Sequence, residues 1–124
     1  MIIHESTKQF GQEQEKHAAD FLQQRGLKLT ERNYQCKIGE IDLIMRDKDD
    51  TLVFVEVRYR GRRDYGGGLE SVTKSKQRKI IRTAKYYLQT NRLHNQSCRF
   101  DVIAVTSHPS ANIQWVKDAF WERF

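Results

Sequence analysis

Two acidic residues, Asp42 and Glu56, are placed where they could bind a metal ion together. Each lies in a short apolar run, 40–45 or 52–59, and the polar stretch 46–51 separates the two runs. Such runs are typical of β-strands and the polar stretch is typical of a turn, so the sequence predicts an antiparallel hairpin. If the hairpin closes symmetrically about its turn, Asp42 directly faces Glu56 and both side chains share one face of the sheet.

Two carboxylates opposed in this way would repel each other by about 3 kcal/mol at an effective dielectric constant of about 20. The repulsion is relieved by a proton shared between the two acids, or by a cation that both of them bind. With oxygen ligands and no neighbouring His or Cys, the favoured cations are Mg²⁺ and Mn²⁺. The alternative is a register shifted by one residue, which would put the acids on opposite faces, each of them solvated.

Glu15 is a third acid that could point toward this site, from a helix predicted over residues 7–25. Ala18 and Leu22 mark the buried stripe of that helix, and Glu15 precedes them by three and seven residues. It therefore lies on the packed side, where a carboxylate needs a partner, and a site between the two hairpin acids would supply one. In the alternative, Glu15 lies at the border of the stripe and reaches solvent.

The positive charge of the chain is concentrated after the second predicted strand. The net charge is +6, yet residues 58–82 alone carry a balance of +7, from nine basic and two acidic residues. A basic block that begins at the suspected metal site favours a polyanionic partner whose phosphates must reach that site. The alternative is a solvated helix face and a loop. The nine basic residues are Arg58, Arg60, Arg62, Arg63, Lys74, Lys76, Arg78, Lys79 and Arg82.

Length and composition limit the remaining possibilities. The 124 residues are predicted to form one domain, 1–124, that is large enough to bury a core. No apolar run approaches the roughly 20 residues of a membrane span, and the first residues lack the pattern of a signal peptide, so a cytoplasmic protein without membrane contact is expected. Cys36 and Cys98 show no metal-ligand spacing, which argues against a disulfide framework or a zinc site.

A second helix, predicted over 73–90, would bring more polar residues to the sheet. Ser71 or Thr73 could be its N-cap, and Lys74 and Gln77 extend its apolar stripe toward its start. Its N-terminus would thus present hydrogen-bond donors to whatever the sheet holds. Its other basic residues are predicted to point outward, and they are Lys76, Arg78, Lys79, Arg82 and Lys85.

The rest of the chain is predicted to complete the sheet. Asp101 could be a further site acid, although its place near the start of a strand favours a structural, hydrogen-bonded role. Residues 33–37 belong either to the first strand or to the approach to the hairpin. The loop at 60–68 is either a flap over the site or a simple connector. The other predicted elements are strands at 27–30, 98–105 and 113–116, a turn at 107–110 and a short helix that begins at Asp118.

This order of a helix, three strands, a helix and a strand resembles the PD-(D/E)XK nuclease core, the restriction endonuclease-like fold. The segments 39–44 (GEIDLI), 53–58 (VFVEVR), 99–102 (RFDV) and 118–120 (DAF) more closely resemble the YraN family of small bacterial proteins. The resemblance covers nearly the whole chain and implies an α/β fold with a restriction endonuclease-like αβββαβ core, in which helices flank a central mixed sheet. The family is related in fold to Holliday junction resolvases. Since this relation is one of fold, the resemblance implies the fold more strongly than it implies a particular reaction.

The resemblance also implies roles for individual residues. By position, Asp42 matches the metal-binding aspartate of the motif, Glu56 its second acid, and Glu15 the acidic residue of the first helix. Gln77 or Lys74 lies where related nucleases place a polar residue on the helix after the motif.

Arg58 departs from the motif, which has a lysine at this position. The lysine positions or activates the attacking water and stabilises charge on the phosphate. Arginine keeps the positive charge and adds a bidentate phosphate contact, but it cannot act as a base near neutral pH. Glu40, which faces Arg58 in the symmetric register, could also pair with it and remove it from the reaction.

The first hypothesis is therefore a Mg²⁺- or Mn²⁺-dependent endonuclease that hydrolyses phosphodiesters of DNA, including branched or otherwise structured DNA. Asp42 and Glu56 would hold the metal, Glu15 would bind it directly or through water, and Arg58 would contact the scissile phosphate. A resolvase-like role would require a homodimer. The DNA backbone would be bound by Arg60, Arg62, Arg63, Lys74, Lys76, Arg78, Lys79 and Arg82.

Two other functions stay open at this level, so the sequence does not settle whether the protein is an enzyme. Arg58 favours a catalytically inactive nucleic-acid-binding module on a nuclease fold. The intact trio of acids argues against it, because a pure binder gains nothing from carboxylates that repel phosphate. A protein-interaction adaptor would bind its partner through the aromatic residues of the C-terminal segment. The expected role of these residues is instead to close the core. They are Trp115, Phe120, Trp121 and Phe124.

Overall fold

Residues 3–60, 72–106 and 112–121 are described in a computed structural model of the protein. In this part of the chain, no helix combines the length and apolar character that crossing a membrane requires. The loop predicted at 60–68, apart from residue 60 itself, and the turn predicted at 107–110 lie outside the described residues. The elements are α1 (Ile3–Gln24), β1 (Lys28–Gln35), β2 (Glu40–Arg46), β3 (Leu52–Arg60), α2 (Lys74–Thr90), β4 (Cys98–Thr106) and β5 (Asn112–Phe120).

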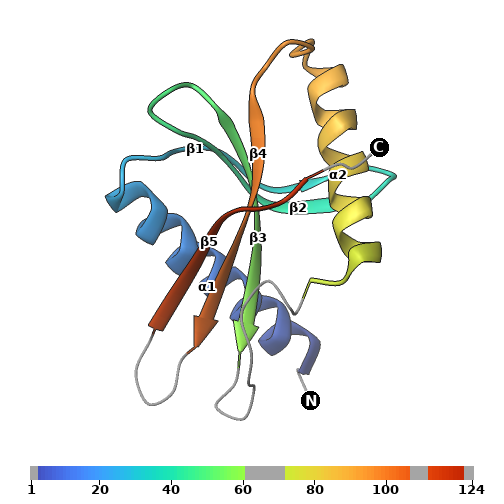
Figure 1. Ribbon diagram of the computed structural model, residues 1–124. Helices are drawn as coiled ribbons and strands as arrows, with labels where there is room; N and C mark the ends of the chain where they lie inside the picture. Colours follow the sequence, from blue (N-terminus) through green and yellow to red (C-terminus); the bar gives the residue numbers. More distant parts are fainter. Residues whose placement is uncertain (1–2, 61–71, 107–111, 122–124) are drawn as a thin grey trace.

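The five strands form one mixed sheet in the order β1-β2-β3-β4-β5 (Figure 1). All neighbouring pairs are antiparallel except β3 and β4, which run parallel and are connected through α2. A parallel pair needs such a crossover, because a tight turn cannot return the chain to the same end of the sheet. The predicted αβββαβ order of the restriction endonuclease-like core is confirmed, and β5 adds an edge strand beside β4.

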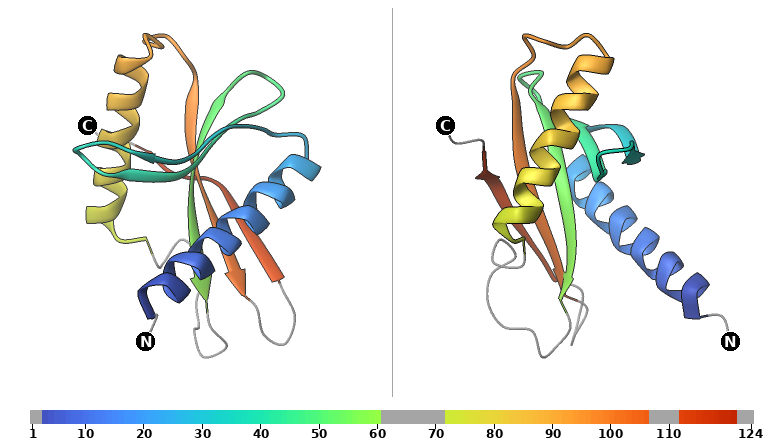
Figure 2. Two further views of the ribbon diagram at one scale, coloured as in Figure 1. Left: turned by 180° about the vertical axis from the view of Figure 1, so that it is seen from behind. Right: turned by 90° about the vertical axis from the view of Figure 1, so that its right-hand side faces the viewer.

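The two helices cover opposite faces of this sheet, as the right-hand view of Figure 2 shows. The stripe of α1 predicted from Ala18 and Leu22 packs on one face, in a cluster that includes Leu43 and Val55. On the other face, the predicted stripe of α2 packs in a cluster with Phe54, Phe100 and Phe120. Because β3 alternates strictly between these clusters, its residues after position 55 continue to point alternately toward α2 and toward α1.

The register predicted for the β2–β3 hairpin is confirmed, but the pairing ends earlier than predicted. Arg46 faces Leu52, and the last paired residues are Leu43 and Val55. The predicted backbone pairs of Asp42 with Glu56 and of Glu40 with Arg58 are not part of the ladder. At Glu40, β2 pairs with β1, and Gln35 Nε2 donates to Glu40 Oε2 at 3.3 Å. The hairpin therefore opens at Asp42.

The C-terminal segment corrects one prediction and confirms another. The short helix predicted from Asp118 is wrong, because β5 runs to Phe120 and pairs with β4. Asp118 adopts a positive φ of 54° at an irregularity in that pairing, and its amide donates to Asp101 Oδ1 at 2.8 Å. Asp101 is completely buried and also accepts hydrogen bonds from Arg99 and from the Trp115 indole, so its predicted structural role is confirmed.

Candidate active site

Asp42 occupies the point where β2 separates from β3. Its Oδ2 accepts a hydrogen bond from the backbone amide of Val57 at 2.8 Å, just beyond the last paired residues of the hairpin. Burial, and then the negative charge of Glu56, raise the pKa of Asp42 to about 8. Near neutral pH this carboxyl group therefore favours a proton or a cation, as the facing-acid argument predicted from the sequence.

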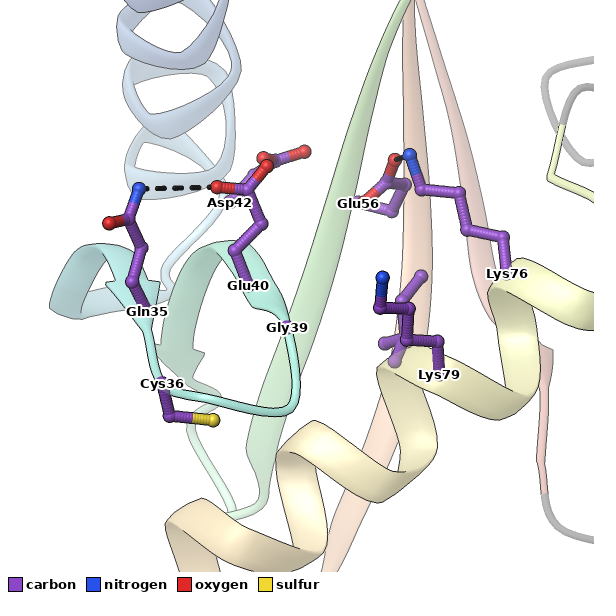
Figure 3. Close-up of a pocket in the computed structure, with 9 residues that line it drawn as sticks. Gln35, Cys36, Gly39, Glu40, Asp42, Glu56, Lys76 and Lys79 are labelled. Carbon is purple, nitrogen blue, oxygen red and sulfur yellow. Dashed lines mark hydrogen bonds and ion pairs between the residues drawn. The ribbon is translucent and has the colours of Figure 1, made fainter.

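Glu56 lies on β3 and is 6% exposed. Two basic residues approach the same oxygen: Lys76 Nζ lies 2.9 Å from Oε2, and Arg58 Nη1 lies 3.4 Å from it. Lys76 comes from α2, and Figure 3 shows its side chain reaching from that helix to the Glu56 carboxylate. Glu56 is therefore a buried carboxylate whose charge is balanced by Lys76 more closely than by Arg58.

Glu15 approaches Asp42 from α1. Its Oε1 is buried and has no hydrogen-bond partner within the described part of the chain. Burial raises the pKa of Glu15, an effect that its neighbours Asn33 and Arg32 partly offset. An unpartnered buried carboxylate oxygen is rare, because it loses its hydration without compensation, and it marks a place where a cation or water would be stabilising.

The carboxylates of Asp42 and Glu56 open into a pocket of about 370 Å³ between the β1–β2 connection and α2. Figure 3 shows Lys76 and Lys79 on the α2 side of this pocket and Gln35, Glu40 and Asp42 on the opposite side. Glu15 is not among the residues that line it. The lining residues are Gln35, Cys36, Gly39, Glu40, Asp42, Glu56, Lys76, Lys79 and Ile80.

Gly39 sets the width of the pocket by allowing the β1–β2 connection to approach α2 closely. A Cβ atom at this position would lie 2.9 Å from Thr83 Oγ1 and 3.3 Å from Lys79 Cε. The absence of a side chain therefore lets the connection pack against the second turn of α2, where Lys79 points into the pocket.

The residues around Asp42 fit a divalent cation with oxygen ligands. Asp42 and Glu56 are carboxylates of opposing strands, Asp42 has a raised pKa, and Glu15 Oε1 has no partner. Within residues 3–60, 72–106 and 112–121, no three His, Cys, Asp or Glu side chains gather closely enough to hold a metal ion by themselves. The donor set therefore fits a cation bound by the hairpin pair, with water completing its coordination, as Mg²⁺ prefers.

The other predicted site residues are distributed differently from the prediction. Gln77 is half-buried and does not line the pocket, because its Nε2 donates to the Val72 carbonyl at 3.0 Å. Arg78 and Arg82 are exposed on α2, as predicted. Lys74 is exposed as well, so the prediction that it extends the apolar stripe of the helix is wrong. The side chain of Arg60, together with Arg62 and Arg63, lies outside the described residues.

The prediction that Lys76 points outward is wrong. It lies four residues before Ile80, and Ile80 is buried, so Lys76 continues the packed stripe toward the N-terminus of α2. The prediction counted back seven and four residues from Ile81, to Lys74 and Gln77. Counting back four residues from Ile80 would have identified Lys76 from the sequence. Lys79 also lines the pocket, although its side chain is exposed, and the sequence pattern gives no comparable signal for it.

Comparisons with known proteins identify relatives over most of the chain. The model of the "Uncharacterised protein family UPF0102" matches residues 14–105. A UPF0102 protein of Nitrosococcus oceani is 50% identical over 112 residues, which cover 89% of this chain and 90% of that protein. A UPF0102 protein of Psychromonas ingrahamii is 55% identical over 109 residues, 87% of this chain and 86% of that protein.

Two solved structures share weaker similarity. The EndoMS–dsDNA2 complex matches 60% of this chain and 26% of its own, with 18% identity and a TM-score of 0.32. A repair endonuclease from Pyrococcus abyssi matches 68% of this chain and 30% of its own, with 19% identity and a TM-score of 0.34. The chain thus spans less than a third of either protein.

Proposed function

The chain belongs to the UPF0102 family, which confirms the family resemblance found in its sequence. From the geometry of its acidic pocket and its basic helix, we propose that it is a metal-dependent endonuclease that acts on DNA. The observation that carries the proposal is the Asp42 carboxyl group, whose pKa is raised to about 8 beside Glu56 at the mouth of a pocket. A protein gains no stability from two acids buried together, so their proximity favours a functional explanation.

Asp42 and Glu56 would hold Mg²⁺ or Mn²⁺, and Glu15 would contribute through a bound water. The cation would lower the pKa of a bound water and stabilise negative charge on the scissile phosphate. Val57 fixes the Asp42 carboxylate through its backbone amide, which orients the second oxygen. Arg58 would contact the phosphate through its positively charged guanidinium group. It would not act as a general base, because this group cannot accept a proton near neutral pH.

The exposed basic residues of α2 would bind the DNA backbone on either side of the reacting phosphate. Lys74, Arg78 and Arg82 lie on the helix that forms one wall of the pocket. Contacts of this kind give an affinity that decreases with salt and carries little sequence preference. Cleavage of both strands of a branched DNA would further require a homodimer, which sedimentation of the protein with and without DNA would detect.

A nucleic-acid-binding module without turnover is the second candidate function. Two observations favour it: Arg58 replaces the lysine of the motif, and Lys76 pairs with Glu56 at 2.9 Å. In that case the basic helix would bind the phosphate backbone, and the acidic pair would not support hydrolysis.

Calorimetric titration of Mn²⁺ and Mg²⁺ into the protein and its Asp42→Asn variant, followed by incubation with labelled linear and four-way-junction DNA, distinguishes the two. Asp49→Asn is the matched control, because Asp49 is an exposed acid in the turn of the same hairpin. We expect metal binding and cleavage in the protein and the control, and neither in Asp42→Asn. DNA binding without metal binding or cleavage would leave the binding module as the better function.

A further inference from the structure

Lys76 contacts Glu56 from the first turn of α2, and two residues near the start of the helix, Thr73 and Ile80, fix the position of that turn. Its backbone amide donates to Thr73 Oγ1 at 3.1 Å, where Thr73 is the N-cap of α2. One turn later, Ile80 is 4% exposed and holds the same helix face against the sheet. The side chain of Lys76 is thus directed toward Glu56 by the start of the helix, while 44% of it stays accessible to solvent.

Lys76 and a divalent cation would compete for the same carboxylate. Lys76 Nζ lies 2.9 Å from Glu56 Oε2, and Glu56 is 6% exposed, so little room is left around this oxygen. A divalent cation and an ammonium group that bind the same carboxylate oxygen repel each other, because both are positively charged and lie within a few ångströms of each other. Binding of the cation by Glu56 therefore requires the Lys76 ammonium group to move away.

A substrate anion is the new partner that the pocket would offer to the displaced ammonium group of Lys76. The acids among the described residues that line the pocket are Glu40, Asp42 and Glu56. Asp42 would be bound to the same cation, and Glu40 lies on the opposite side of the pocket from Lys76 (Figure 3). A DNA phosphate drawn to the cation would bring its oxygens to the α2 wall, within reach of a flexible four-carbon side chain. Arg58 is less suited to this exchange, because its contact with Glu56 is longer, at 3.4 Å.

From these contacts we infer that Lys76 is an exchangeable counter-ion of the site: it pairs with Glu56 until a divalent cation binds there, and then contacts a DNA phosphate. The inference rests on the proposed function and deepens it. It assigns to α2 the lysine that the motif lacks at Arg58, and it makes cation binding and phosphate binding cooperative through one side chain.

The first test is calorimetric titration of Mn²⁺ into the protein and its Lys76→Met and Lys79→Met variants. Removing the competing ammonium group should strengthen Mn²⁺ binding about three- to tenfold in Lys76→Met. Lys79 is the matched control, because it lines the same pocket and no ion pair of it occurs in the described part of the chain. Lys79→Met should change Mn²⁺ affinity by less than about twofold, because Lys79 forms no ion pair with Glu56 that a cation would have to break.

Thermal unfolding separates this exchange from a purely structural role of Lys76. Before Mn²⁺ is added, Lys76→Met should unfold at a lower temperature than the protein, because Glu56 is left buried without its closest partner. Saturating Mn²⁺ should remove that difference. A difference that persists unchanged with Mn²⁺ would mean that Lys76 only supports the fold.

Fluorescence anisotropy of labelled duplex DNA tests the phosphate contact, with Ca²⁺ as an oxygen-binding cation. Ca²⁺ should strengthen DNA binding by the protein and by Lys79→Met, and should do so about three- to tenfold less in Lys76→Met. An equal effect of Ca²⁺ in all three proteins would overturn the inference. So would unchanged Mn²⁺ affinity in Lys76→Met, whereas failure of every variant and of the protein itself to bind Mn²⁺ would overturn the proposed function as well.

Discussion

Replacing Asp42 with asparagine should stabilise the folded protein, and the gain should grow as the pH rises. In the folded protein the pKa of Asp42 is raised from 3.8 to about 8, first by burial and then by the charge of Glu56. Between these two pH values the folded state binds a proton that the unfolded state does not bind. The stability that this proton contributes is complete below pH 3.8 and is lost as the pH rises through about 8.

Asparagine carries no charge at any pH, and its carbonyl oxygen can still accept the hydrogen bond from Val57. The difference in unfolding free energy between the variant and the protein should therefore increase by about 1.4 kcal/mol per pH unit. From pH 5 to pH 8 this amounts to at most about 4 kcal/mol. The sign is unusual, since most acidic residues in folded proteins make stability rise with pH over their titration range.

Urea denaturation followed by circular dichroism, at several pH values from 5 to 8 and with a chelator present, measures this difference. Asp49→Asn is again the control, because hydrogen bonds from Thr51 lower the pKa of Asp49, so that it stays ionised throughout this range. Its effect on stability should not vary from pH 5 to pH 8. The reasoning about Asp42 is refuted if the gain in Asp42→Asn is equally independent of pH, or if the variant is the less stable protein at pH 8.

Two further substitutions test how the fold positions the site. Asp101→Asn should lower the free energy of unfolding, measured with urea, by about 3 to 5 kcal/mol, because it breaks a buried ion pair with Arg99. A decrease below about 1 kcal/mol would contradict the role of this ion pair in stability. Gly39→Ala should cost about 1 to 3 kcal/mol, since its Cβ would lie 2.9 Å from Thr83 Oγ1. Gly11→Ala has open space around it in α1 and should instead gain up to about 1 kcal/mol, so an equal response of the two glycines would rule out the close approach.

The elements and the register of the hairpin could be predicted because they depend on local patterns. Apolar residues at helical spacing defined α1 and α2, and the two apolar runs around a polar turn defined β2 and β3. The turn is held as the pattern suggests, with Asp47 and Thr51 joined through their backbones and Arg46 paired with Asp50. Patterns of this kind are reliable because each residue responds to its own neighbours in the chain.

The errors arose where contacts distant in sequence decide the conformation. The segment that begins at Asp118 was predicted to be helical, yet it continues a strand that pairs with β4 as far as Phe120. Asp118 adopts a positive φ there, and its amide donates to Asp101. No pattern within the segment reports that bond. The prediction for Lys76 failed for a simpler reason. Ile80 and Ile81 are both buried, but the stripe was extended toward the N-terminus of the helix from Ile81 alone.

The opening of the hairpin at Asp42 joins the fold to the candidate chemistry. If β2 and β3 had stayed paired beyond Leu43, a backbone carbonyl of β2 would have been the partner expected for the Val57 amide. Instead the Asp42 side chain accepts that amide, so the hydrogen bond is kept while the strands separate. Glu56 stays a close neighbour of Asp42 after the strands separate, and Glu15 approaches Asp42 from α1. The departure from regular pairing thus leaves the Asp42 side chain bound to the backbone of β3 and beside Glu56, as expected where function overrides local preference.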